Sequence, residues 1–393
     1  MKNIKRTRKQ LYRFLLITLG FLSAFGPFVT DMYLPSLPSL AKEFSTTNSM
    51  AQLSLTMSMF GLAIGQILIG PVSDKYGRRK LLLGSLFVYT AATLGCIFAE
   101  NIQIFNLMRL FQGMAGAGGI VLSRSIATDL YSSERLTQFI SMIAAINGIA
   151  PVIAPIIGGV ILSFADWTVV FWVLLVIGLI LIGLSMRLRE SLSARNRLQT
   201  PLINSFKNYR NLISNRTYVI HFCIYMFSAF VLFTYISASS FILQDIYKLS
   251  SLMFSLCFAV NAIAIATGCA TAGHLQKKKS IKYGAIIMFC AALSSIVTLN
   301  TVHSVILTEV TFIVLMFAFG LLQPIPTAIA LDSERNNAGV ASAALGASGF
   351  LAGGIVAPIV GMGNMLQTTT ILFLAGSLFV GIFAFLSFRI CKK

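Results

Sequence analysis

Two long apolar runs are joined by Gly70-Pro71-Val72-Ser73-Asp74-Lys75-Tyr76-Gly77-Arg78-Arg79-Lys80. We predict that these 11 residues form a short basic turn that holds two helix ends close together, because glycine tolerates backbone conformations that other residues avoid. Asp74 can oppose the partial charge of a helix end or pair with a neighbouring arginine. The stretch therefore indicates a tight connection between two membrane-spanning helices.

The composition places the chain in a membrane, because 56% of its residues are hydrophobic and only 11% are charged. Crossing about 30 Å of hydrocarbon takes roughly 20 apolar residues. Twelve such runs can be counted, at 12–40, 50–73, 81–99, 104–128, 139–164, 167–186, 218–243, 251–273, 281–301, 305–331, 339–362 and 368–388. The sequence thus predicts an all-α integral membrane protein with 12 transmembrane helices in two six-helix bundles.

A polar linker and a short repeat indicate two similar halves. We expect an N-terminal bundle over 1–186, a cytoplasmic linker over 187–217 and a C-terminal bundle over 218–393. Apolar residues at helical spacing over 201–213 predict an amphipathic helix on the cytoplasmic face. Ala154-Pro155-Ile156-Ile157-Gly158 in the fifth run recurs as Ala357-Pro358-Ile359-Val360-Gly361 in the eleventh, as expected for parallel repeats.

The distribution of basic residues predicts the topology. With both termini in the cytoplasm, 26 of the 30 Lys and Arg fall in cytoplasmic segments, and only Lys42 and Lys248 fall in external loops. The net charge of +18 is therefore interpreted as topology plus contact with anionic membrane lipids, and we expect no nucleic-acid partner.

Other kinds of site have little support in the sequence. The 6 Cys lie scattered without a CxxC pair, and the 3 His show no ligand spacing, so no metal is expected. We find no phosphate-binding loop and no arguable pair of nucleophile and base. We therefore expect a protein that is not an enzyme, has no cofactor and acts as a monomer.

Charged side chains inside the apolar runs are the candidates for chemistry, since each costs about 2.5–3.5 kcal/mol to insert. They are Asp31, Arg109 and Arg124. Asp31 precedes Pro35 and Pro38, which interrupt helix hydrogen bonding, so we expect a kinked helix end around a cavity. A carboxylate there could take up and release a proton near neutral pH. The alternative is an Asp that only caps a broken helix.

The fourth run places Arg109 and Arg124 on one helical face with small residues between them, so that both can point into the bundle. Arg109 either modulates a nearby carboxylate or serves as a buried partner that fixes helix packing. Asp129 follows at the cytoplasmic end, where we expect a charge network with Asp74 and Arg78 that closes the inside of the N-terminal half.

The fifth run is rich in glycine and proline, including Pro151, Pro155, Gly158 and Gly159. Such a run permits close helix approach and local bending, as an alternating-access hinge or interface requires. We therefore predict a gating role for this span.

Several of these segments resemble transporters of the major facilitator superfamily, and in particular its drug:proton antiporters. The G-x-x-x-D-x-x-G-R-R-K pattern at 70–80 is similar to their loop between the second and third spans. The 154–159 segment is similar to their antiporter motif, with Ala154 in place of the first glycine. The strings over 233–247 and 254–261 are similar to the bicyclomycin and chloramphenicol resistance branch. Where members often end the fourth span with Arg-Asp-x-Tyr, this chain has Thr128-Asp129-Leu130-Tyr131, and Arg124 stands one turn earlier.

The resemblance implies proton-coupled efflux of small molecules, such as drugs, across a bacterial inner membrane by alternating access. It implies proton coupling through Asp31, with Arg109 and Arg124. Some relatives carry a second acid two turns earlier, where this chain has Ser23, so we favour neutral or zwitterionic substrates. The alternatives are an exporter of a metabolite (a sugar, an amino acid or a metal-chelating small molecule) and a uniporter.

The substrate cavity is expected near the midplane, between the halves. Its predicted lining is Asp31, Tyr225, Phe233, Tyr235, Asn261 and Gln323. The predicted gating residues are Gly70, Asp74, Gly77, Arg78, Asp129, Pro155, Gly158 and Gly159. Glu309 in the tenth run is either interfacial or faces the cavity, and the sequence leaves both open.

Overall fold

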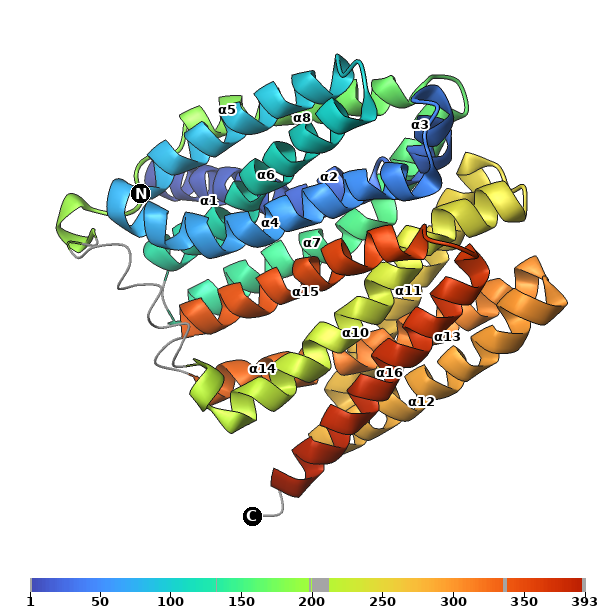
Figure 1. Ribbon diagram of the computed structural model, residues 1–393. Helices are drawn as coiled ribbons and strands as arrows, with labels where there is room; N and C mark the ends of the chain where they lie inside the picture. Colours follow the sequence, from blue (N-terminus) through green and yellow to red (C-terminus); the bar gives the residue numbers. More distant parts are fainter. Residues whose placement is uncertain (1, 132, 198, 200–211, 335–337, 391–393) are drawn as a thin grey trace.

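The computed structural model describes residues 2–131, 133–197, 199, 212–334 and 338–390, and all regular elements among them are helical (Figure 1). In this part of the chain, 10 helical segments are long and apolar enough to cross a membrane. The other two spans are α6 (Ile102–Leu130) and α7 (Ser133–Leu162). The predicted all-α membrane fold with 12 spans in two bundles is confirmed.

The first span of the N-terminal bundle is broken. It consists of α1 (Lys2–Ser23), α2 (Phe25–Asp31), the short 3-10 helix η1 (Leu34–Ser36) and α3 (Leu37–Glu43). Pro35 and Pro38 lack the N–H that a continuous helix would use, so the helical hydrogen bonding stops just after Asp31. The bundle is completed by α4 (Asn48–Tyr76), α5 (Arg78–Ile97), α6, α7 and α8 (Trp167–Met186).

The C-terminal bundle has the same number of spans. They are α10 (Arg216–Phe241) with η3 (Ile242–Ile246), α11 (Ser251–His274), α12 (Lys277–Val297) with η4 (Thr298–Val302), α13 (Val305–Leu322) with α14 (Pro324–Ser333), α15 (Ala338–Val360) and α16 (Met365–Ile390). Between the bundles, the structure describes the one-turn helix η2 (Ala194–Asn196). The predicted amphipathic helix falls mainly on 201–211, outside the described residues, and stays a prediction.

The connection at 70–80 differs from the predicted turn. α4 continues to Tyr76 and α5 begins at Arg78, so only Gly77 lies outside a helix. Gly77 has φ +100°, in the region that L side chains rarely adopt, and this one residue reverses the chain. The prediction of an eleven-residue turn was therefore wrong, because Pro71 is accommodated inside α4.

The two bundles lie side by side, with α7 and α15 at their junction in Figure 1. α7 packs against α11 of the other half, and α15 packs against α4. Glycines at or just after the end of each repeated segment allow the helices to approach closely in both contacts. A Cβ at Gly159 would lie 2.8 Å from the Ser251 carbonyl oxygen, and one at Gly361 would lie 2.6 Å from the Ser49 Cα. The repeat in the sequence thus marks two equivalent interfaces between the halves.

We call the end of the molecule with the α4–α5 connection the basic end, and the end with η1 the opposite end. At the opposite end, Ser240 Oγ donates to the Leu34 carbonyl oxygen at 2.7 Å, and Gln244 Nε2 donates to the Pro35 carbonyl oxygen at 3.1 Å. One hydrophobic core runs through both halves there. The bundles are therefore closed against each other at the opposite end.

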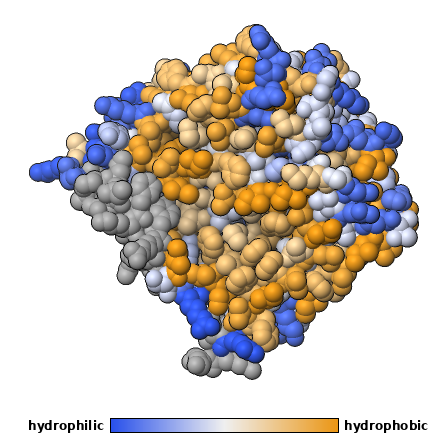
Figure 2. All heavy atoms as spheres, in the orientation of Figure 1, coloured by the Kyte–Doolittle hydropathy of each residue, from blue (hydrophilic) through white to orange (hydrophobic). Residues whose placement is uncertain are grey.

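The visible outer surface matches a membrane environment. In Figure 2, hydrophobic side chains cover the middle of the visible face, and hydrophilic ones gather toward the ends of the helices. Large apolar side chains such as Leu179, Ile306 and Phe385 are more than half exposed. In water such a surface would be unstable, so it is interpreted as the face toward lipid.

Candidate functional site

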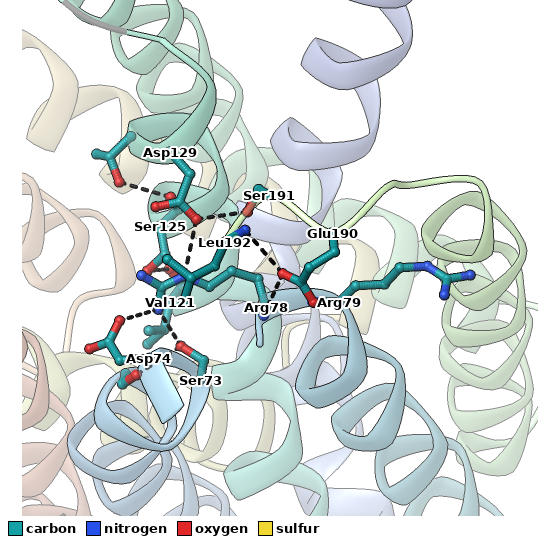
Figure 3. A network of polar contacts seen from close by, with 12 residues as sticks. Ser73, Asp74, Arg78, Arg79, Val121, Ser125, Asp129, Glu190, Ser191 and Leu192 are labelled. Carbon is teal, nitrogen blue, oxygen red and sulfur yellow. Dashed lines mark hydrogen bonds and ion pairs between the residues drawn. The ribbon is translucent and has the colours of Figure 1, made fainter. Parts of the chain in front are cut away.

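A charge network ties together three helices at the basic end (Figure 3). Arg78 forms ion pairs with Asp74 at 2.6 Å and with Asp129 at 3.2 Å, and its Nη1 also donates to Ser73 Oγ at 2.5 Å. Ser191, just after α8, donates to the same carboxylate oxygen of Asp129 at 2.7 Å. The structure thus brings together the three charged side chains that the sequence predicts as neighbours, while their gating role stays a prediction.

Glu190 is a member of this network that the sequence reasoning missed. Its carboxylate accepts from the backbone N–H of Arg78 at 2.9 Å and of Arg79 at 3.2 Å, the free donors at the start of α5 (Figure 3). An acid at this place satisfies donors that the helix itself cannot and complements the helix dipole. The sequence contains one indication of its role, because Glu190 is the only acidic residue between 187 and 217.

Arg109 is fully buried inside the N-terminal bundle. Its Nη1 and Nη2 both donate to the Val29 carbonyl oxygen at 3.1 Å, and Nη1 also donates to Gln112 Oε1 at 2.5 Å. The guanidinium lies over the Tyr33 ring, 4.1 Å from its centroid. The described residues place no carboxylate in an ion pair with Arg109. The guanidinium instead holds the chain on both sides of the break that carries Asp31.

Asp31 lines a cavity between the two halves. Its side chain is 6% exposed, and Thr30 Oγ1 donates to its Oδ1 at 2.7 Å. The cavity has a volume of about 250 Å³, and four predicted residues from the C-terminal half also line it: Tyr225, Phe233, Tyr235 and Gln323. The break after Asp31 and the packing of α10 thus bring an acid together with aromatic rings from the other half.

This cavity continues toward the basic end into a more polar space of about 390 Å³. The two spaces share Tyr225 and Gln323 as lining residues. The second is also lined by Arg124 and Ser23. Arg109 and Arg124 therefore do not share one environment: Arg109 is enclosed in the N-terminal bundle, and Arg124 lies at the cavity.

Asn261 does not line the cavity. It is fully buried on α11, where its Nδ2 donates to Glu309 Oε1 at 2.5 Å and to the Cys257 carbonyl oxygen at 3.0 Å. Glu309, which the sequence left open, points into the C-terminal bundle, where Asn261 meets it. The sequence pattern could not show which way Asn261 points, because α11 is apolar on almost all sides.

Most of the predicted gating glycines and prolines lie at helix contacts. A side chain at Gly158 would overlap the Met32 carbonyl oxygen, one residue after Asp31, and Gly159 meets Ser251 and Ser255 of the other half. Pro155 is buried within α7. A Cβ at Gly70 would lie 4.0 Å from Val121, an ordinary contact, so packing does not require that glycine in this conformation.

A larger groove lies elsewhere on the described surface. It has a volume of about 930 Å³ and runs between α12 and α16, where Phe289 and Leu378 line it. Both helices belong to the C-terminal half, so this groove cannot alternate between the two ends as a space between the halves can. The cavity at Asp31 is therefore the candidate site.

Comparison with known proteins agrees with the fold. The family model described as the Major Facilitator Superfamily matches residues 19–358. The chain is 36% identical over 351 residues to an uncharacterized MFS-type transporter, YdgK, of Bacillus subtilis. This alignment covers 88% of the chain and 87% of that relative. The chain is 31% identical over 280 residues to a bicyclomycin resistance protein homolog of Haemophilus influenzae, over 71% of this chain and 69% of that relative.

A solved structure shows the same fold. A bacterial homolog of the human lysosomal transporter Spinster superposes with a TM-score of 0.74 at 16% identity, over 96% of this chain and 97% of that one. The resemblance that the motifs indicate is confirmed. The two bundles, the cavity between them and the family match identify the chain as a multi-pass membrane transporter of the major facilitator superfamily.

Proposed function

We propose that this protein exports small neutral or zwitterionic molecules, including drugs, in exchange for protons by alternating access. The observation that carries the proposal is the Asp31 carboxylate in a largely apolar cavity between the halves. Such a site suits apolar ligands, with a few polar groups to orient them.

Asp31 has few partners that would hold it permanently charged. Thr30 donates one hydrogen bond, and Arg109 binds the Val29 carbonyl oxygen instead of the carboxylate. A charge in such a place is costly unless it is paired or neutralised. A proton neutralises it in one half of the cycle, and the bound substrate displaces the proton in the other.

The charges at the cavity favour substrates without a large net charge. Asp31 lies at one end and Arg124 at the other, with aromatic rings from α10 between them. A dication would meet Arg124, and an anion would meet Asp31, whereas a neutral or dipolar molecule can fit both. The Haemophilus influenzae relative is named for bicyclomycin resistance, which supports a drug among the substrates.

One proton is energetically sufficient for this task. Moving one charge through 100 mV supplies about 2.3 kcal/mol, enough for a gradient of roughly 50-fold in a neutral substrate. We place both termini and the basic end in the cytoplasm of a bacterial cell, and the protein in its inner membrane as a monomer. Lys279 and Lys282, beside the groove between α12 and α16, support contact with anionic lipid headgroups.

The test uses everted membrane vesicles with an imposed pH gradient, acid inside. Addition of a panel of antibiotics and metabolites should dissipate the gradient with wild type and fail to do so with Asp31→Asn. Asp166→Asn, the same change at an exposed position before α8, is the matched control and should behave as wild type. Substrate uptake without proton movement would instead identify a uniporter, and responses only to metabolites would identify a metabolite exporter.

A further inference from the structure

A second acid lies within the C-terminal half, outside the cavity. Glu309 is on α13, and its Oε1 accepts from Asn261 Nδ2 of α11 at 2.5 Å. It does not line the cavity at Asp31, so it cannot hold a substrate there directly. The role of Glu309 must therefore be inferred from the residues around it.

The contact between Glu309 and Asn261 leaves two buried acceptor atoms unpaired. Asn261 uses both hydrogens of its amide, one for Glu309 and one for the Cys257 carbonyl oxygen. Asn261 Oδ1 and Glu309 Oε2 are then two buried acceptors without a partner among the described residues. Buried polar atoms in native proteins almost always have partners. A proton on Glu309 Oε2 would turn one of these two acceptors into a donor.

No cation among the described residues pairs with Glu309. The titratable groups near it are the Tyr235 hydroxyl from α10 and the Cys257 thiol from α11. The ion pairs in the described part of the chain all involve Arg78, in the N-terminal half. An unpaired carboxylate is therefore surrounded by neutral groups.

Tyr235 links this acid to the cavity. Tyr235 lines the cavity with Asp31, and its buried hydroxyl, without a hydrogen-bond partner among the described residues, lies within electrostatic range of Glu309. A movement of α10 against α13 during alternation would change the access of Glu309 to cavity water. The two acids thus lie one on each half, and Tyr235 is near both of them.

We propose that Glu309 is a second proton-carrying group, so that one transport cycle moves two protons, one on Asp31 and one on Glu309. The proton adds to the free lone pair of Glu309 Oε2 and gives a neutral carboxyl group that can donate to a neighbouring acceptor. In the other conformation of the transport cycle, the proton is released to water, and the Glu309 carboxylate is restored. This inference rests on the proposed function, because it presumes that the protein is a proton antiporter.

The test measures the number of protons that are exchanged for each substrate molecule. Purified protein in liposomes is given a series of pH gradients with the membrane potential clamped at zero, and the limiting gradient of a neutral substrate is measured. The logarithm of the substrate gradient should rise with the pH difference with a slope of about two for wild type and about one for Glu309→Gln. Glutamine matches the protonated form in shape and can donate to Asn261, so folding should be kept.

Glu100→Gln, at an exposed position after α5, is the matched control and should keep the wild-type slope. A lower rate with an unchanged slope in Glu309→Gln would overturn the proposal and leave Glu309 a structural partner of Asn261. A wild-type slope of about one would overturn it too, while leaving the exchange through Asp31 intact. A slope of zero in wild type would contradict the antiport itself.

If Glu309→Gln is folded but inactive, infrared difference spectra taken on acidification decide the question. Wild type should show the carbonyl band of two newly protonated buried carboxyl groups, and Glu309→Gln should lose one of them. An identical band in both proteins would overturn the proposal.

Discussion

At the scale of single residues, Arg109 shows how a buried charge is accommodated without a counter-ion. Its guanidinium donates twice to one carbonyl oxygen, that of Val29, and lies over the Tyr33 ring. These contacts flank Asp31 on both sides along the chain. Of the two roles that the sequence left open, the geometry supports that of a residue that fixes packing, and through it positions Asp31.

Replacing Arg109 with lysine should slow transport about tenfold or more, since hydrogen bonds to charged groups contribute about 1.5–3 kcal/mol and lysine cannot reproduce the planar fork. Initial transport rates at equal protein level in the membrane measure this. The exposed Arg187→Lys is the matched control. Wild-type rates in Arg109→Lys would show that charge alone suffices at this position.

Gly77 should not tolerate a side chain. Gly77→Ala forces a residue with a Cβ into φ +100° and brings that Cβ to 2.6 Å from Glu190 Oε2, so we expect a loss of about 1–3 kcal/mol of stability. Thermal denaturation in detergent measures it. Gly84→Ala, where no atom lies within 4 Å, should melt as wild type does. Equal midpoints for both variants would contradict the role of Gly77.

The sequence predicts residues well where one local feature decides their role. Asp31 is an acid in an apolar run before two prolines, and the cluster of Asp74, Arg78 and Asp129 follows from the ends of adjacent helices. Asn261 was assigned to the cavity and lies behind it, because the rotation of a helix that is apolar all round is set by tertiary packing. Glu190 was missed because the contact depends on how the chain folds back after α8.

At the scale of helices, the two copies of Ala-Pro-x-x-Gly end in glycines that meet different neighbours. Gly158 of α7 lies against the break of the first span in its own half, and Gly361, just after α15, lies against the start of α4 in the other half. The sequence could predict these elements and their close approach. It could not predict that α4 runs unbroken to Tyr76, because a proline inside a helix is tolerated only where neighbouring groups compensate.

Gly158→Ala should weaken the closed conformation at the opposite end, because its Cβ would overlap the Met32 carbonyl oxygen. A cysteine introduced by Ser49→Cys, beside Pro358 of the other half, should then react faster with a polar thiol reagent. Gly183→Ala, which meets no atom within 4 Å, is the control. Unchanged reactivity would mean that α7 does not control closure.

At the scale of the whole molecule, we interpret the structure as one state of the proposed transport cycle. The halves share a hydrophobic core and hydrogen bonds at the opposite end, whereas the cavity extends toward the basic end past Arg124. Transport requires a second state in which these contacts open. The polar contacts between Ser240, Gln244 and the backbone of η1 suit this purpose, because each exchanges readily for water.

The central claim is that a proton and a substrate compete at Asp31. The most direct measurement is equilibrium binding of a substrate from the vesicle panel to purified protein over a pH series, with the released protons counted. For wild type, affinity should fall as the pH falls, approaching about tenfold per pH unit where Asp31 becomes protonated, and binding should release a proton. Asp31→Asn should bind without this proton release. Binding to wild type that is independent of pH, or equal proton release by both proteins, would contradict the account.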